Sequence, residues 1–594
     1  MLGVFFVVLT NYFRILAPQI TGYIVNTVVE SISKSSTSNL HHSYRAHEYN
    51  QLVNELISYF SILSYDKKIL YAGIVLFALA IISGLFMFLM RQTIIVMSRH
   101  IEYDQKNEIY QHYQQLDITF FKRNATGDLM NRISEDVSRV RMYTGPALMY
   151  FINLIAVIGF SIYFMFQSDV RLTIYTLCPL PVLAIVIYYV NAVINQKSET
   201  IQAQLSTLTS EAQETYSGIR VIKSFAQEKA IIDHFKLNTK AYRKGVLSLA
   251  KTEALYFPSM GLLIGISTLI TVMVGTLDVV HGVEGANVGR IAEFVLYIQM
   301  LTFPVSAIGW TASMIQRAAA SQKRINEFLL TQPLIKDSEE AKNLQLQGSI
   351  ELKNIDFTYE HTQIHAINNL SLSIKKGEKI ALIGKTGSGK TTLAQLLLKM
   401  YNADQGTIDY DEIPIEKIKL NSIRSSISYV PQDVFLFSDT IAENIRFGKE
   451  DANEEEVIKA AKEACIYDEI ISLPDGFQTL IGERGVTLSG GQKQRISIAR
   501  AMIKEPNIVV FDDCLSAVDT QTERNILEKL NVYLNKKTAI IITHRIFSLF
   551  SFDKIVVIDE GRIIEMGNHE ELMDIKGQYY QLFHRQQMDD RNVV

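Results

Sequence analysis

The chain has 594 residues, too many for one ordinary hydrophobic core, so its length predicts two or more domains. A net charge of −4 is close to neutral for this size and argues against a nucleic-acid-binding protein. A hydrophobic content of 48% and a mean hydropathy of +0.11 are high for a soluble protein and predict a membrane portion. Long uncharged runs fill residues 1 to about 320, whereas residues 349–585 have the pattern of a soluble α/β domain.

The N-terminal uncharged runs predict membrane-spanning helices. Five runs are 20 to 25 residues long, and each can cross about 30 Å of hydrocarbon. Residues 2–28, uncharged apart from Arg14, are expected to form one more span. A signal peptide is the alternative, but a basic n-region is absent and other spans follow. The early start suggests a missing leader or a shortened chain. We expect spans at about 2–28, 69–97, 143–168, 171–196, 254–280 and 290–316, in a transmembrane domain of residues 1–330.

Basic residues in the segments between the spans predict the orientation of the chain in the membrane. Segments 98–142 and 195–251 contain seven and nine lysines and arginines, whereas segment 31–66 contains two and 277–289 contains none. The two basic segments are therefore expected in the cytosol, as long helical extensions of the spans. This arrangement places both chain ends in the cytosol, and we expect a multi-pass protein of the plasma membrane, the inner membrane in bacteria.

Residues 379–398, KIALIGKTGSGKTTLAQLLL, predict a strand, a glycine-rich turn and a helix. The turn fits G-x-x-x-x-G-K-[ST], in which backbone N–H groups at a helix N-terminus bind phosphate oxygens. Lys390 is expected at the β- and γ-phosphates, and the Thr391 hydroxyl on Mg²⁺. The candidate ATP-binding residues of this loop are Gly384, Lys385, Thr386, Gly387, Ser388, Gly389, Lys390, Thr391 and Thr392.

ATP is expected rather than GTP because no guanine-reading motif is evident in the sequence. Tyr359, upstream of the loop, can stack on an adenine, although a plain strand aromatic is the alternative. Downstream, the apolar strand 508–511 ends in Asp512, a carboxylate expected near Mg²⁺.

LSGGQ at 488–492 opens an amphipathic helix. A serine and two glycines at a helix start offer a hydroxyl and exposed N–H groups to an anion, although a plain N-cap is the alternative. The chain already has one phosphate loop for its own ATP. A second anion-binding site is therefore expected to close over the ATP of another subunit. The candidate contacts to that ATP are Ser489, Gly490, Gly491 and Gln492.

In their order, these motifs resemble the nucleotide-binding domain of ATP-binding-cassette (ABC) transporters over residues 349–585. The whole chain resembles a type IV exporter half-transporter. The stretches FFKRNATGDLMNRISEDV (120–137) and ETYSGIRVIKSFAQE (214–228) resemble the cytosolic turns that dock on such domains. The resemblance implies an all-α six-helix transmembrane domain, a linker at 331–348, an α/β P-loop ATPase domain and a C-terminal tail at 586–594.

The resemblance also assigns roles to further residues. Gln432 in YVPQD is the Q-loop residue that contacts Mg²⁺ and the attacking water, and His544 in IIITHR contacts the γ-phosphate. GERG at 482–485 and residues 516–519 match the X-loop and the D-loop. In the family, two domains enclose two ATPs, each between one chain's phosphate loop and the other chain's LSGGQ. The expected cofactors are therefore ATP and Mg²⁺, and the expected partner is a second ABC half-transporter.

Asp513 departs from the family pattern, in which a glutamate after Asp512 positions the attacking water. An aspartate is shorter by one C–C bond, about 1.5 Å, so ATP binding is expected to persist while hydrolysis is slow. That is the pattern of the degenerate subunit of a heterodimeric exporter, and a heterodimer with a catalytically stronger partner is expected. A homodimer in which Asp513 works well enough is the alternative, and it is favoured by the retained His544. The candidate catalytic residues are Asp513, His544 and Gln432.

The expected function is ATP-driven export of hydrophobic or amphipathic small molecules or lipids by alternating access. A homodimeric exporter or lipid flippase with two equivalent ATP sites is the near alternative. An importer ATPase is disfavoured because its membrane spans are normally on separate chains, and an ATP-gated channel or sensor is a further alternative. Membrane lipids are expected partners and nucleic acid is not.

Overall fold

The structure is a computed structural model that describes residues 1–35, 49–482, 488–515, 520–544 and 551–592. The chain forms two compact units. Unit 1 comprises Met1–His112 and Leu129–Leu330, and unit 2 comprises Tyr113–Asp128 and Thr331–Val594. A short segment of the N-terminal half therefore packs with the C-terminal half.

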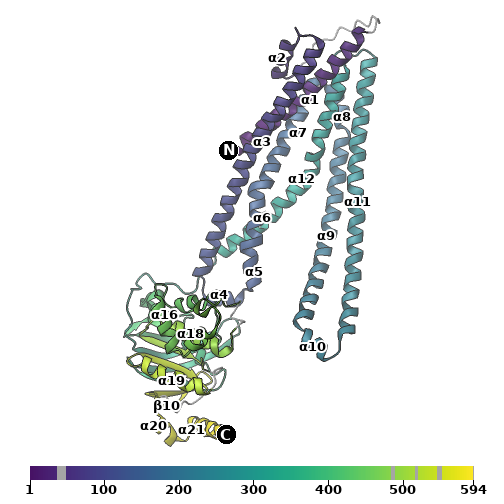
Figure 1. The fold of residues 1–594 in the computed structure, drawn as a ribbon. Coiled ribbons are helices and arrows are strands. Elements are labelled where there is room, and N and C mark those ends of the chain that lie inside the picture. The colour runs from purple at the N-terminus through teal and green to yellow at the C-terminus, as the bar shows by residue number, and fades with distance from the viewer. Residues whose placement is uncertain (36–48, 483–487, 516–519, 545–550, 593–594) are drawn as a thin grey trace. The chain divides into compact units, whose positions relative to one another are not determined.

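Long helices make up the first 330 residues (Figure 1). Two π-helical turns, at Arg132–Asp136 and Tyr143–Ala147, interrupt the run from α5 to α7. The helices are α1 (Leu2–Ser35), α2 (Gln51–Phe60), α3 (Tyr65–Gln115), α4 (Ile118–Arg123), α5 (Thr126–Asn131), α6 (Val137–Met142), α7 (Leu148–Ser168), α8 (Val170–Leu177), α9 (Pro179–Ser217), α10 (Ile219–Ser224), α11 (Glu228–Val280) and α12 (Val288–Leu329).

Six helical stretches among the described residues are long and apolar enough to cross a membrane. Each contains one of the expected spans, and the longest, Glu228–Val280, has 53 residues. The six-helix expectation and the long helical extensions are thereby confirmed. The stretches are Leu2–Ile32, Tyr65–Gln115, Thr126–Ser168, Val170–Ser217, Glu228–Val280 and Val288–Leu329.

Close backbone contacts and polar pairs hold the helices of unit 1 together. α1 and α12 approach closely at Gly289, where an added Cβ would lie 2.0 Å from the Gly22 carbonyl oxygen. Beside it, Asn26 Nδ2 donates to Asn287 Oδ1 at 2.9 Å. Small residues and interhelical amide bonds of this kind replace the hydrophobic driving force that lipid does not provide.

α9 and α11 run side by side as an antiparallel pair that α10 closes at one end (Figure 1). At the other end, Asp169 caps α8 by accepting from Leu172 N at 2.9 Å. The same carboxylate accepts from Arg290 Nη1 of α12 at 3.0 Å. These contacts fix the short connection between α7 and α8 to the start of α12.

Two sheets form the body of unit 2. A four-stranded antiparallel sheet has the order β2-β1-β4-β5, and a six-stranded sheet has the order β10-β9-β3-β8-β7-β6. In the larger sheet the strands from β9 to β6 are parallel and β10 pairs antiparallel to β9. The strands are β1 (Ile350–Tyr359), β2 (Ile364–Ile374), β3 (Lys379–Ile383), β4 (Gln405–Tyr410), β5 (Ile413–Pro414), β6 (Ile427–Val430), β7 (Ile508–Asp512), β8 (Thr538–Thr543), β9 (Lys554–Asp559) and β10 (Arg562–Gly567).

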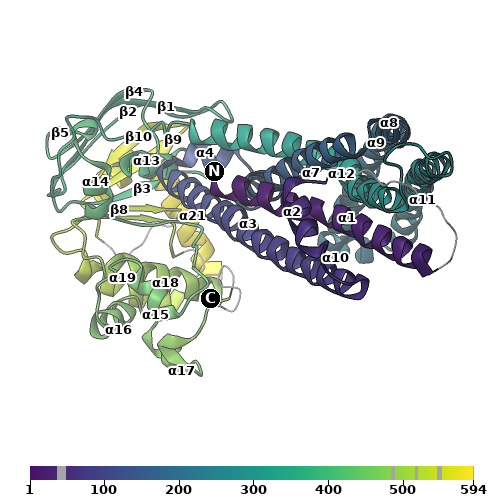
Figure 2. The ribbon, with the colours of Figure 1, turned by 90° about the horizontal axis from the view of Figure 1, so that it is seen from above.

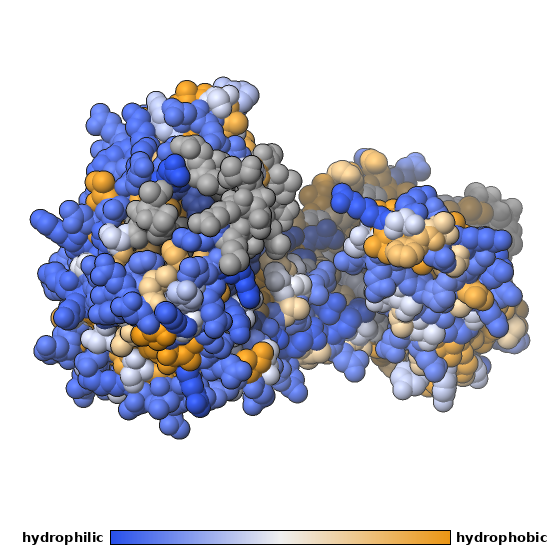
Figure 3. Space-filling view, turned by 90° about the horizontal axis from the view of Figure 1, so that it is seen from below, coloured by the Kyte–Doolittle hydropathy of each residue, from blue (hydrophilic) through white to orange (hydrophobic). Residues whose placement is uncertain are grey.

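Helices cover the sheets of unit 2. Figure 2 shows α15 to α19 gathered on one side of the six-stranded sheet, with β1, β2 and β4 on the other. Figure 3 shows a largely hydrophilic surface on the face of unit 2 drawn there, with hydrophobic residues in small groups. The helices after residue 389 are α13 (Lys390–Leu397), α14 (Leu420–Ser426), α15 (Ile441–Arg446), α16 (Glu454–Glu463), α17 (Tyr467–Ser472), α18 (Gly490–Met502), α19 (Thr520–Tyr533), α20 (His569–Ile575) and α21 (Gln578–Asn592).

The parallel register brings three strand ends to one edge of the larger sheet. Ile383 at the end of β3 pairs with Thr543 at the end of β8, and Asp512 at the end of β7 pairs with Ile542. The strands are buried on both faces, as parallel strands with helical cover are. The expected α/β fold of the C-terminal half is confirmed, and the residues after these strands share one edge.

Candidate nucleotide-binding site

The glycine-rich loop joins β3 to α13 and has backbone conformations that glycine allows. Gly387 has φ +82° and Gly389 has φ +100°. A Cβ on Gly389 would lie 2.4 Å from the Ala366 carbonyl oxygen, whereas one on Gly387 would meet nothing within 4 Å. The loop is thus packed tightly at Gly389 and has open space at Gly387. This shape suits phosphate oxygens bound by backbone N–H groups.

Lys390, the first residue of α13, is buried, and its ammonium group is held by the loop. Its Nζ donates to the carbonyl oxygens of Gly384 at 2.8 Å and Lys385 at 2.7 Å. Burial lowers the pKa of Lys390, and the charges of Asp512 and Asp513 oppose that effect.

Asp512 lies beside Thr391. Thr391 Oγ1 donates to Asp512 Oδ1 at 3.1 Å, and Tyr429 OH donates to Asp512 Oδ2 at 3.1 Å. Burial raises the pKa of Asp512, the two hydroxyl groups lower it, and the negative charge of Asp513 raises it further. A hydroxyl and a carboxylate oxygen are ligand types that Mg²⁺ accepts, so these residues fit the expected ion.

Asp513 and Gln432 contact each other at the same sheet edge. Gln432 Nε2 donates to Asp513 Oδ2 at 3.3 Å, and Gln432 is exposed. Asp513 has a left-handed backbone with φ +46°, and its N–H donates to the Ile542 carbonyl at 2.9 Å. His544 is exposed and directly follows β8, which lies between β3 and β7. Asp513 and His544 therefore follow β7 and β8, which end at this edge of the sheet, and Gln432 follows the neighbouring strand β6.

Tyr359 ends β1 and contacts the helix that follows the glycine-rich loop. Its hydroxyl lies 3.0 Å from Thr392 Oγ1 and donates to Gln395 Oε1 at 3.2 Å. Lys122 Nζ from α4 lies 5.3 Å from the centre of the Tyr359 ring. Tyr359 is thus tied to α13 as well as to its own strand, which places an aromatic ring next to the phosphate loop.

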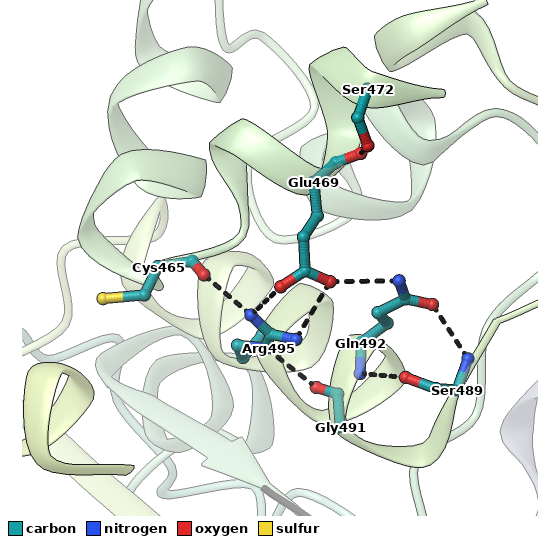
Figure 4. A network of polar contacts seen from close by, with 7 residues as sticks. All are labelled: Cys465, Glu469, Ser472, Ser489, Gly491, Gln492 and Arg495. Carbon is teal, nitrogen blue, oxygen red and sulfur yellow. Dashed lines mark hydrogen bonds and ion pairs between the residues drawn. The ribbon is translucent and has the colours of Figure 1, made fainter. Parts of the chain in front are cut away.

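The LSGGQ segment begins α18 with a capping box. Gln492 N donates to Ser489 Oγ at 3.2 Å, and Ser489 N donates to Gln492 Oε1 at 2.9 Å. The Gln492 side chain also reaches Glu469 of α17 (Figure 4). Among the described residues, the side-chain contacts of Ser489 and Gln492 stay within α17 and α18. The first turn of α18, with Gly490 and Gly491, keeps N–H donors that no intrahelical acceptor uses.

Sequence reasoning missed three groups of site residues. Tyr429 was detectable as a tyrosine in a buried strand, because its hydroxyl needs a polar partner. Lys122 and the Glu469–Arg495 pair, by contrast, are brought close to Tyr359 and Gln492 only by the folding of the chain. Residues 483–485 and 516–519, the greater part of the expected X-loop and the expected D-loop, lie outside the described residues.

Comparisons with known proteins match both halves of the chain. Residues 1–305 match the family "ABC transporter transmembrane region", and residues 367–516 match the family "ABC transporter". The chain is 35% identical over 491 residues to the "Probable multidrug resistance ABC transporter ATP-binding/permease protein YheI" of Bacillus subtilis (strain 168). That match covers 81% of this chain and 82% of the relative.

A second relative and a solved structure agree with this result. The chain is 33% identical over 513 residues to the "Multidrug resistance-like ATP-binding protein MdlA" of Escherichia coli (strain K12), covering 86% of each. The fold is similar to "Structure of a bacterial Atm1-family ABC exporter with ATP bound", with a TM-score of 0.76 and 23% identity. That match covers 98% of this chain and 97% of the solved one.

Proposed function

The chain belongs to the ABC transporter family, and on that premise we propose that it exports hydrophobic or amphipathic small molecules or lipids as one half of a dimer. It is a multi-pass protein of the inner membrane with a cytosolic ATPase domain. Two of the relatives are named as multidrug resistance proteins, which supports a broad amphipathic substrate class for this chain.

The phosphate loop and the carboxylate pair carry the proposal. The Lys390 ammonium group donates to a carbonyl oxygen of the loop, and the Thr391 hydroxyl donates to the Asp512 carboxylate. The residues Gly384–Thr392 and Tyr359 would bind ATP, and Thr391, Asp512 and Gln432 would hold Mg²⁺. Bound Mg²⁺ would neutralise charge on the β- and γ-phosphates.

The LSGGQ segment supports dimerisation. The described hydrogen bonds of its Ser489 and Gln492 side chains stay within α17 and α18, so the first-turn N–H groups remain suited to an anion from another chain. A second half-transporter would supply that anion as the γ-phosphate of its own ATP. Closure of two ATPase domains over two ATPs would drive the membrane helices outward-facing, and hydrolysis would reset them.

Asp513 supports a heterodimer with a catalytically stronger partner. Its carboxylate is short for positioning an attacking water, and in this structure it is engaged by Gln432. A homodimeric exporter or lipid flippase is the second candidate, favoured by the retained His544 next to β8. In such a homodimer, a small backbone shift or an extra water would make up for the shorter Asp513 side chain.

Transport into inverted membrane vesicles tests the proposed function. A fluorescent amphipathic cation should accumulate in vesicles that contain the protein only when Mg²⁺ and ATP are supplied. Lys390→Ala, which removes the phosphate-binding ammonium group, should abolish accumulation and serves as the matched control. Accumulation that is independent of ATP, or unaffected by Lys390→Ala, refutes ATP-driven export.

The pairing is tested by the mass of the assembly in lipid nanodiscs. Co-purification of a related chain that carries glutamate after its strand-end aspartate supports the heterodimer. A symmetric dimer of this chain with full ATP turnover supports the second candidate instead. A stable monomer that still transports refutes both.

A further inference from the structure

One polar network ties the LSGGQ segment to the neighbouring helix α17, and its centre is Glu469 (Figure 4). Glu469 Oε1 accepts from Arg495 Nη1 at 2.5 Å, and Oε2 accepts from Arg495 Nη2 at 3.1 Å. Oε2 also accepts from Gln492 Nε2 at 3.0 Å. Two residues of α18, one turn apart, are thus held by a single carboxylate.

Arg495 connects the network to the backbone on two sides. Its Nη1 donates to the Cys465 carbonyl at 2.9 Å, and its Nε donates to the Gly491 carbonyl at 3.2 Å. The Arg495 side chain is only 8% exposed, whereas that of Glu469 is 42% exposed. Arg495 therefore anchors Gly491 from within α18, and Glu469 is the partner that reaches α18 from outside the helix.

The carboxylate also decides which way the Gln492 amide points. A carboxylate only accepts hydrogen bonds, so the amide must turn its NH₂ group toward Glu469 and its oxygen away. That oxygen is the acceptor for Ser489 N in the capping box. An amide turned the other way would face Glu469 with an oxygen and Ser489 N with an NH₂ group. Both contacts would then be lost.

We propose that Glu469 is a positioning residue that acts through Gln492 and Arg495 to set the first turn of α18 for the γ-phosphate of the partner subunit's ATP. This inference rests on the proposed function, since only a closed dimer brings a phosphate to that turn. The capping box uses Ser489 Oγ and its N–H, and the fixed turn presents the N–H groups of Gly490 and Gly491. The hydrogen bonds that the Glu469 carboxylate accepts from Arg495 and Gln492 are charge-assisted, and such bonds are stronger than those between neutral groups.

Glu469→Gln is the test, made in the full-length assembly reconstituted in lipid. The variant keeps the side-chain length but removes the charge and allows either amide orientation. Replacing charge-assisted bonds by neutral ones is expected to lower ATP turnover on the order of tenfold. ATP binding to this chain's own phosphate loop, followed by a fluorescent ATP analogue, should remain within about twofold because the substitution leaves that loop untouched.

Matched variants separate positioning from folding. Glu469→Asp keeps the charge on a shorter side chain and should restore part of the lost turnover. Asp468→Asn removes the same charge from the neighbouring, exposed position of α17 and should leave turnover unchanged. Because Glu469 acts partly through the Gln492 amide, the loss in Glu469→Gln combined with Gln492→Ala should be smaller than the two single losses combined.

The outcomes that overturn the proposal are distinct. Wild-type turnover in Glu469→Gln, additive losses in the double variant, or a parallel loss of nucleotide affinity each refute a positioning role. A wild-type assembly that neither hydrolyses ATP nor transports refutes the proposed function itself.

Discussion

Asp513→Glu tests whether the carboxylate after β7 limits hydrolysis. The substitution extends the carboxylate by about 1.5 Å, one C–C bond. Since a misplacement of about 1 Å can cost on the order of 10²-fold in rate, a full correction would return a similar factor. The structure reduces that figure, because Gln432 Nε2 lies 3.3 Å from Asp513 Oδ2 and stands in the way of a longer side chain. Gln432 is exposed and can rotate aside, so we expect turnover to rise about tenfold.

The backbone adds a small opposing effect on stability. Asp513 has φ +46°, a left-handed conformation that aspartate adopts more readily than glutamate. The longer side chain should therefore destabilise the folded domain by less than about 1 kcal/mol. This strain is present in the ground state and in the transition state alike, so it should lower the melting temperature slightly without cancelling the gain in rate.

The assay is the initial rate of ATP hydrolysis at saturating Mg²⁺ and ATP, for the chain alone in nanodiscs and with its co-purified partner. Asp513→Gln has the length of glutamate without the charge and should not raise the rate, which separates reach from basicity. KM should be unchanged, because the phosphate loop binds the nucleotide. A rate that stays level or falls in Asp513→Glu, at unchanged KM and with no more than the slight expected drop in melting temperature, refutes the idea that the short carboxylate is limiting.

Three further predictions follow from single contacts. Tyr429→Phe removes a hydrogen bond that lowers the pKa of Asp512, so that pKa should rise further and the acid limb of Mg²⁺-dependent turnover should shift to higher pH. An unchanged pH profile would contradict this. Gly387→Ala meets no atom within 4 Å but must adopt φ +82°, so strain of about 1 kcal/mol should lower the free energy of unfolding of the domain, as measured by denaturant titration; an unchanged midpoint would contradict this. Asn453→Ala removes the capping box of α16 and should destabilise that helix by about 1 kcal/mol, seen as roughly fivefold faster amide hydrogen exchange there; equal exchange rates would rule the cap out.

The sequence was sufficient for features that depend on local chemistry. A run of some twenty apolar residues spans a membrane whatever it packs against, so the six spans were predictable from length and hydropathy. The phosphate loop was predictable for a similar reason. Gly387 and Gly389 occupy conformations with positive φ, and such a loop leads from a strand into a helix wherever the motif occurs.

Only the tertiary structure decided which distant residues complete the site. Tyr429 reaches Asp512 because β6 and β7 are neighbours in the sheet, although 83 positions separate the two residues. Glu469 reaches Gln492 and Arg495 because α17 lies against the start of α18. The residues of one turn that contact a ligand have a fixed spacing along the chain, so they form a recognisable sequence motif. The residues that hold them in place come from other elements, and their contacts are set by strand order and helix packing, which leave no spacing rule in the chain.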